Sequence, residues 1–202
     1  MIETGPHVPS KHLAQGSRTL GGMFCARVAL SRDRAAYYEK HHGEWQGVSW
    51  GEFYRRAACV AQGLVALGLE PGDRISILGP TTGRWVCLDM GAQLAGIVSV
   101  GLYPMQTVDQ LRYLIDHCDS RLIFVDGAQE LDNVLEAVRD NKKVIAIVPW
   151  SDELAASVRV RDPRVFPFNH FEKMPIDDAE RDQRLAARDW DCLLYTSPSP
   201  RD

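Results

Sequence analysis

The fold is decided by the stretch Arg74–Val125, which reads RISILGPTTGRWVCLDMGAQLAGIVSVGLYPMQTVDQLRYLIDHCDSRLIFV. It opens and closes with short apolar runs of strand length, Arg74–Leu78 and Leu122–Val125, and contains a third at Ile97–Val100. Strands that are apolar on both faces and alternate with helices are typical of a parallel sheet covered on both sides. The sequence therefore predicts an α/β fold, a mostly parallel sheet with flanking helices.

Helix start and stop signals lie on both sides of these strands. Ser49 and Glu52 form a predicted capping box, in which each side chain bonds the backbone amide at the other's position. The residues behind it recur at helical spacing: Phe53, Ala57, Val60, Leu64 and Leu67. Gly68 is expected to end this helix in the left-handed conformation. A second capping box, Thr107 with Gln110, predicts a helix that runs to Cys118.

The same patterns extend the fold in both directions. We expect helices over Arg84–Ala95 and Leu131–Val138, and a fourth strand over Val144–Val148 that Pro149 stops. Tyr37–Ser49 is expected to form a short hairpin around a polar turn. The strand connections should be right-handed crossovers.

The ends of the chain are less regular. Residues 1–22 are rich in Gly, Pro, Ser and His and are predicted to be a loose leader, with periodic structure starting near Met23. Beyond Pro149 the pattern weakens, and the polar segment Asp177–Arg188 is a candidate helix.

Composition excludes several classes of protein. A hydrophobic content of 45% is too high for a disordered chain, and 23 Lys plus Arg against 27 Asp plus Glu leave no basic surface for nucleic acid. No window approaches the roughly 18 apolar residues of a membrane helix, and the first thirty residues hold no apolar stretch of signal-peptide length. The cysteines form no CxxC pair, which predicts reduced thiols in a cytoplasmic protein: Cys25, Cys59, Cys87, Cys118 and Cys192.

The turn Gly79–Arg84 is the first place to look for phosphate binding, because the free amides at a helix amino terminus attract anions. A P-loop has four residues between its glycines and then Lys-Ser or Lys-Thr, whereas here three intervene and Arg84-Trp85 follow. The dinucleotide pattern GxGxxG is also missing. We interpret the turn as a tight strand-to-helix connection that uses glycine for its backbone freedom.

The other polar candidates are His41-His42, His117-Cys118, Asp89 and Asp116. Neighbouring residues on a strand point to opposite faces, and on a helix they point about 100° apart, so neither adjacent pair converges on one metal ion or proton. The two aspartates are interpreted as isolated carboxylates. We therefore assign no catalytic, cofactor-binding or metal-binding residue.

Several sequence features then occur together, in a fixed order, over Trp45–Asp126. They are VSWGEF at 48–53, GLVALGLEPGDRISIL at 63–78, Trp85 with Asp89, GAQLAGIVSVGLYP at 91–104, Gln110 with Tyr113 and Ile115, and SRLIFVD at 120–126. This order resembles the opening of the AMP-forming (ANL) adenylating enzymes, which include acyl-CoA synthetases and luciferases. Gly101–Pro104 and the helix behind it look most like bacterial long-chain fatty acyl-CoA synthetases.

The resemblance implies that residues 23–191 form a partial AMP-binding amino-terminal domain. The full-length protein is then expected to be an ATP-dependent long-chain fatty acid–CoA ligase that uses fatty acid, ATP, Mg²⁺ and CoA, with no nucleic acid partner. The family's phosphate loop, YTSGTTG-x-PKG, and its other catalytic motifs would follow this chain. We thus expect this fragment to be inactive and to bind none of these molecules. Peripheral membrane association and oligomeric state stay open.

The last eleven residues, Cys192–Asp202, read CLLYTSPSPRD and resemble a translated sequencing-library adapter. We therefore expect residues 192–202 to be a non-native tail. Tyr195-Thr196-Ser197 stands where the family's phosphate loop begins, but Pro198 and Pro200 follow in place of Gly-Thr-Thr-Gly. Proline has no amide hydrogen to donate to phosphate, so this ending does not suit such a loop.

Two other interpretations remain from the sequence. The chain is a fragment of another ANL enzyme, a medium-chain or aryl acid–CoA ligase, or it is a non-catalytic α/β binding module. Substrate assays on a full-length clone separate the first from a long-chain ligase, and cooperative folding of residues 1–191 would favour the second.

Overall fold

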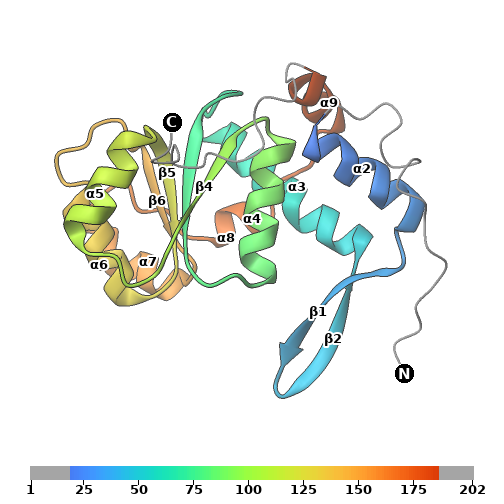
Figure 1. Cartoon of the computed structure of the whole chain (residues 1–202), viewed down its shortest axis with the longest axis horizontal. Coiled ribbons are helices and arrows are strands. Elements are labelled where there is room, and N and C mark those ends of the chain that lie inside the picture. Colours follow the sequence, from blue (N-terminus) through green and yellow to red (C-terminus); the bar gives the residue numbers. More distant parts are fainter. Residues whose placement is uncertain (1–18, 187–202) are drawn as a thin grey trace, which may run out of the picture.

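The computed structural model describes residues 19–186. It confirms the α/β class: Figure 1 shows one twisted sheet with helices on both faces and a separate two-stranded hairpin. The sheet holds four parallel strands in the order β4-β3-β5-β6. Their bounds are β3 Arg74–Leu78, β4 Val98–Leu102, β5 Ser120–Val125 and β6 Ala146–Pro149.

Two hydrophobic cores lie on opposite faces of the sheet, because alternate strand residues point to opposite sides. On β5, Leu122 and Phe124 enter one core, whereas Ile123 and Val125 enter the other. The first core packs against α2 (Leu20–Ser31), α3 (Trp50–Ala66), α4 (Gly83–Leu94) and α8 (Asn169–Glu172). The second packs against α5 (Val108–His117), α6 (Ala128–Ala137) and α7 (Asp152–Val158).

The predicted hairpin is present. Strand β1 (Ala35–His41) pairs antiparallel with β2 (Glu44–Ser49). Its two-residue turn places His42 at φ 49° and Gly43 at φ 89°, the positive values that a tight hairpin turn of matching twist requires. The hairpin rests on α3, where the rings of Tyr37 and Phe53 meet edge to face, with centroids 5.3 Å apart.

The predicted helix caps are present, with one difference. At α5, Thr107 Oγ accepts from Gln110 N at 3.3 Å and Gln110 Oε1 accepts from Thr107 N at 3.0 Å, a complete capping box. At α3, Ser49 Oγ accepts from Glu52 N at 3.2 Å as predicted. The Glu52 carboxylate instead accepts from two arginines one turn further along the helix, Arg55 and Arg56. A charged donor makes the stronger hydrogen bond, so it competes successfully with the backbone amide.

Other element boundaries differ from the prediction. Residues 20–22, expected in the leader, form the first turn of α2, which Thr19 caps. Pro149 does not stop β6 but is its last residue. Ile147 N points away from β5 and donates to Arg164 O, so Pro149, two residues on, faces the same outer side, where its missing N–H breaks no ladder bond. The short helix α7 was not predicted.

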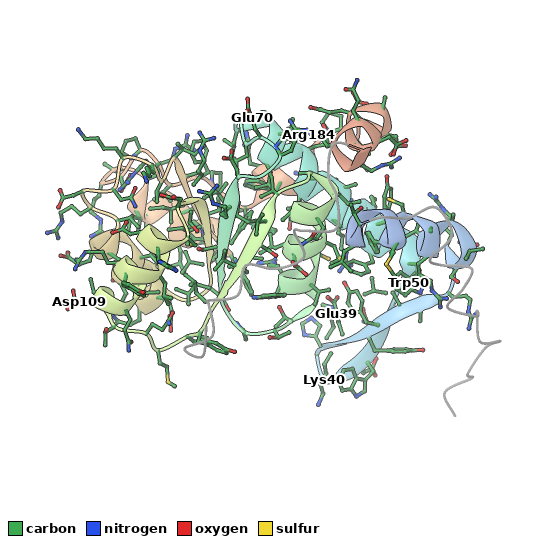
Figure 2. All side chains as sticks on the ribbon, turned by 45° about the horizontal axis from the view of Figure 1, so that its top comes forward. Glu39, Lys40, Trp50, Glu70, Asp109 and Arg184 are labelled. Carbon is green, nitrogen blue, oxygen red and sulfur yellow. The ribbon has the colours of Figure 1, made fainter. Side chains whose placement is uncertain are left out.

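Helix α9 (Asp178–Ala186) confirms the described part of the candidate helix at 177–188. Arg181 lies over the Tyr54 ring of α3, 5.7 Å from its centroid. Arg184 Nη1 donates to Leu69 O at 3.2 Å and to Ala95 O at 3.5 Å, which joins α9 to the segments that follow α3 and α4. Figure 2 shows Arg184 beside Glu70 at this junction.

Gly63 is required by close packing inside α3. A Cβ at this position would lie 2.3 Å from Cδ1 of Phe171, a ring on α8 that is fully buried between α3 and the sheet. Helix propensity alone favours alanine over glycine here by about 1 kcal/mol, so packing and propensity oppose each other at this residue.

We predict that Gly63→Ala lowers the free energy of unfolding by about 1–3 kcal/mol, since overpacking a filled core exceeds the gain in propensity. Urea unfolding followed by circular dichroism measures the change. Ala66→Gly, at the exposed last residue of the same helix, is the control and should cost less than the propensity difference of about 1 kcal/mol that applies inside a helix. A more stable Gly63→Ala protein would show that Phe171 does not occupy this position.

Candidate functional site

The carboxyl edge of the sheet is the candidate functional site, because open parallel sheets bind ligands there, at the point where successive connections leave in opposite directions. From β3 the chain moves outward to β4, then returns past β3 to β5. The switch point therefore lies between the ends of β3 and β5, where Gly79 and Asp126 follow the two strands. Trp150 follows β6 at the same edge.

The Trp150 indole ring fills the switch point. A Cβ at Gly79 would lie 2.8 Å from Cη2 of Trp150 and 3.1 Å from Cβ of Asp126, so glycine is needed here for close approach. Trp150 is only 8% exposed, and its Nε1 has no hydrogen-bond partner within the described part of the chain. The crevice between β3 and β5 is thus packed with an aromatic side chain.

Arg84 ties the start of α4 to this edge. Its Nη1 donates to Trp150 O at 2.6 Å, and its guanidinium lies 4.5 Å from the centroid of the Phe168 ring. A cation over an aromatic face is attracted by the ring electrons, more strongly when water is partly excluded. Arg84 therefore holds α4, the end of β6 and the segment before α8 together.

The amino terminus of α4 lies against a carboxylate of the protein itself. Thr82 caps the helix, and a Cβ at Gly83 would lie 2.0 Å from Oε1 of Glu39, on the hairpin. Figure 2 shows Glu39 between the hairpin and the helices, with Lys40 at the hairpin's outer end. Glu39 also accepts from Arg56 at 3.3 Å. Because the amino terminus of a helix carries partial positive charge, the nearby Glu39 carboxylate stabilises α4.

A groove of about 1270 Å³ is lined by residues of the hairpin, α3, α4 and α8. Phe53, Val60 and Phe171 contribute to its apolar wall, and Glu39 and Arg56 to its charged rim. In it the Tyr37 hydroxyl lies 3.7 Å from Sγ of Cys87. Burial raises the pKa of Cys87 to about 11 and also raises the pKa of Tyr37. Both groups are therefore protonated at neutral pH, and Cys87 is not an activated thiolate.

The members of the adjacent pairs His41-His42 and His117-Cys118, considered in the sequence analysis, contact different neighbours in the structure. His41 Nε2 lies 3.2 Å from Glu39 Oε2, and His42 sits in the hairpin turn. Among residues 19–186 no three His, Cys, Asp or Glu side chains gather into a possible metal site. His117 stacks on Tyr113 with centroids 5.5 Å apart, whereas Cys118 Sγ lies 3.0 Å from Ser120 Oγ.

The two carboxylates also have local partners. Asp89 accepts from the hydroxyl of Ser99 on β4, and burial raises its pKa although the Ser99 and Gln93 hydrogen bonds oppose the shift. Asp116 accepts from Asn141 Nδ2 at 2.6 Å. Asp119, three residues after Asp116, pairs with Lys143. Asp89 thus joins α4 to β4, and Asp116 joins the end of α5 to the loop before β6.

Sequence reasoning missed Glu39 and Trp150. Trp150 carried a weak signal, since it directly follows the last apolar strand of a parallel sheet. Glu39 carried none, because its proximity to Gly83 depends on how the hairpin folds back onto α4. The candidate loop residues Leu193–Ser197 and the whole tail 192–202 lie outside the described residues.

We predict that Glu39→Gln lowers the free energy of unfolding by about 0.5–2 kcal/mol, because it removes the negative charge at the amino terminus of α4 and the partner of Arg56. Urea unfolding at low salt measures the loss, which should shrink in 1 M NaCl as the charges are screened. Glu44→Gln, at the exposed tip of the same hairpin, should change stability little. Equal effects of the two substitutions would contradict the assigned role.

We further predict that Cys87 in the folded protein is slow to react with iodoacetamide at pH 8. With a pKa of about 11, about one thiol in a thousand is ionised there, against about a quarter for an ordinary cysteine of pKa near 8.5. Mass spectrometry of peptides, with the urea-unfolded chain as the control, measures the rate. Fast alkylation of Cys87 in the folded chain would show that the thiol is ionised.

Comparison with known proteins agrees with the family resemblance seen in the sequence. A model of the AMP-binding enzyme family matches residues 24–199. Long-chain-fatty-acid–CoA ligase ACSBG2 of Xenopus laevis is 26% identical over 184 residues, which cover 89% of this chain and 24% of that protein. ACSBG1 of Bos taurus is 27% identical, over 69% of this chain and 19% of its own length. The chain thus spans about a quarter of the length of these relatives or less. Both are animal enzymes, so the likeness to the bacterial branch stays a prediction.

Solved structures share the fold. The A-PCP didomain of carboxylic acid reductase from Segniliparus rugosus, in complex with AMP, gives a TM-score of 0.70 at 18% identity, over 83% of this chain and 28% of that one. A putative long-chain-fatty-acid CoA ligase from Rhodopseudomonas palustris gives 0.66 at 18% identity, over 81% and 39%. Because the family model extends over most of its length, this chain belongs to the AMP-binding enzyme family.

Proposed function

We propose that this chain is the amino-terminal part of an ATP-dependent long-chain fatty acid–CoA ligase. The observation that carries the proposal is the match to long-chain-fatty-acid–CoA ligase ACSBG2 over 89% of the chain, within the AMP-binding family match. In this reaction a fatty acid carboxylate attacks the α-phosphate of ATP and displaces pyrophosphate. The thiol of CoA then attacks the acyl carbonyl of the adenylate, and AMP leaves.

The described residues would serve this reaction as a scaffold. The switch point of the sheet is filled by Trp150, and the amino terminus of α4 already faces Glu39. We therefore propose that the groups that bind ATP and stabilise the transition state belong to the rest of the protein. Backbone amides and a lysine would offset phosphate charge there, and Mg²⁺ would neutralise the phosphate oxygens.

We also propose a cytoplasmic location. The four described cysteines, Cys25, Cys59, Cys87 and Cys118, are free thiols, as expected in a reducing compartment. In residues 19–186 no helix is long and apolar enough to cross a bilayer.

We predict that the chain of 202 residues gives no ATP–pyrophosphate exchange in the presence of long-chain fatty acids, because the proposal assigns the catalytic groups to the rest of the protein. The protein from a reading frame extended past Asp191 should give exchange and form acyl-CoA. A substrate panel with medium-chain and aryl acids then tests the preference. Exchange by the 202-residue chain above the level of a heat-denatured sample would contradict this assignment.

The extended reading frame is itself a test. A genomic read across the Asp191–Cys192 junction should encode YTSGTTG-x-PKG in place of the present tail. A stop codon or an unrelated sequence at that junction would contradict the ligase proposal.

A further inference from the structure

The groove lined by the hairpin, α3, α4 and α8, which we call the hairpin groove, carries an excess of positive charge. Its lining contains five lysine or arginine side chains and three glutamates. Glu52 accepts hydrogen bonds from both Arg55 and Arg56, and Glu39 accepts one from Arg56 at 3.3 Å. Two cations and two carboxylates of the lining therefore neutralise one another.

The other three cations of the lining are Lys40, Arg84 and Lys173. Within residues 19–186 no ion pair joins any of them to a carboxylate, and the same part of the chain gives Glu172 no cation as a partner. Figure 2 shows Lys40 at the outer end of the hairpin, on the rim of the groove. Three positive charges against one negative charge leave an excess of two positive charges around the groove.

Arg84 is held in position while most of its hydrogen-bond donors stay unused. Its Nη1 donates to Trp150 O at 2.6 Å, and its guanidinium lies 4.5 Å from the centroid of the Phe168 ring. Within the described part of the chain, Nε and Nη2 of Arg84 donate to no acceptor. A guanidinium forms a planar fork that fits two oxygens of one anion. The exposed side chains of Thr81 and Thr82 line the groove beside it, so hydroxyl donors are also at hand.

The same groove exposes apolar surface to water. Tyr37, Trp50 and Val86 are half-buried in its lining, and on the hairpin Tyr38 is 51% exposed and Trp45 is 68% exposed. Removing such surface from water is favourable in proportion to the apolar area that is covered. A free phosphate ion would leave these side chains uncovered, whereas a ligand with a hydrocarbon chain would cover them.

We propose that the hairpin groove binds a single-chain lipid phosphate, which is an acyl or alkyl chain that ends in a phosphate monoester. The chain lies against the aromatic side chains of the lining, and Arg84 binds the phosphate oxygens. The flexible side chains of Lys40 and Lys173 supply the remaining positive charge. A phosphate monoester carries a charge of about −1.5 to −2 at pH 7, which matches the excess of two positive charges better than the single charge of a carboxylate does. This inference adds a ligand to the protein and does not depend on the proposed ligase activity.

Isothermal titration calorimetry of the 202-residue chain with dodecyl phosphate, kept below its critical micelle concentration, tests the site. We expect saturable binding of one molecule per chain, about a hundredfold or more tighter than inorganic phosphate, because each buried methylene group strengthens binding severalfold. Dodecanol has the chain without the charge and should bind about tenfold or more weaker, and dodecanoate, with its single charge, about threefold or more weaker. Absence of saturable binding, or equal affinity for dodecyl phosphate and either of these two molecules, overturns the proposal.

Substitutions of the cations locate the site. Arg84→Gln should weaken the binding of dodecyl phosphate about tenfold or more, because it removes the charged fork. Arg84 also joins α4 to the end of β6, so Lys173→Gln, at an exposed residue, is the second variant and should weaken binding about threefold or more. Arg159→Gln is the matched control, since Arg159 also lies over a ring, 5.5 Å from the Phe166 centroid, but does not line the groove. An equal loss in Arg159→Gln, or unchanged binding in both groove variants, overturns the proposal.

Two other occupants of the groove give different results. If a second copy of the chain fills it, sedimentation velocity shows a dimer that dodecyl phosphate does not dissociate. If the groove faces a lipid bilayer, the chain binds vesicles of phosphatidylcholine and phosphatidic acid but does not bind monomeric dodecyl phosphate. Either result overturns the assignment of a single-chain lipid phosphate.

Discussion

The structure depends on the two parallel ladders that β3 makes with β4 and β5. Parallel strands cannot be joined by a tight turn, so each ladder requires a crossover through a helix. The connections β3–α4–β4 and β4–α5–β5 run in opposite directions across the sheet, so crossovers of one hand place α4 on one face and α5 on the other. On β3, Ile75 and Ile77 face the first core and Leu78 faces the second. The buried hydroxyls of Ser76 and Ser120 lie 2.5 Å apart and form a hydrogen bond with each other.

The same central position of β3 explains the chemistry of the carboxyl edge. Its connections leave in opposite directions, which would open a crevice for a ligand. Here the crevice is closed by Trp150, and the helix amino terminus beside it faces Glu39. Both features stabilise the fold at the place where a nucleotide would otherwise be expected. This filling agrees with our proposal that the described residues of this AMP-binding enzyme support a site whose reactive groups lie in other parts of the protein.

The groove beside the hairpin also contains polar side chains that contact one another. It is large and partly apolar, and it contains a tyrosine and a cysteine in contact. Burial keeps both protonated, and Glu39 is engaged by Arg56 and His41 on the rim. The polar side chains named here thus have partners within the fold, and these contacts hold the hairpin against α3 and α4.

Sequence by itself determined the α/β class, the four strands, the hairpin and the caps of α3 and α5, because hydrophobic period and capping chemistry are local properties. It also gave the family resemblance that the comparisons bear out. Tertiary structure alone decided the strand order, the place of Pro149 on an outer edge, and the approach of Trp150 to Gly79 and of Glu39 to Gly83. These features depend on which segments, far apart in the sequence, the crossovers bring together. A local sequence pattern carries no information about such long-range contacts.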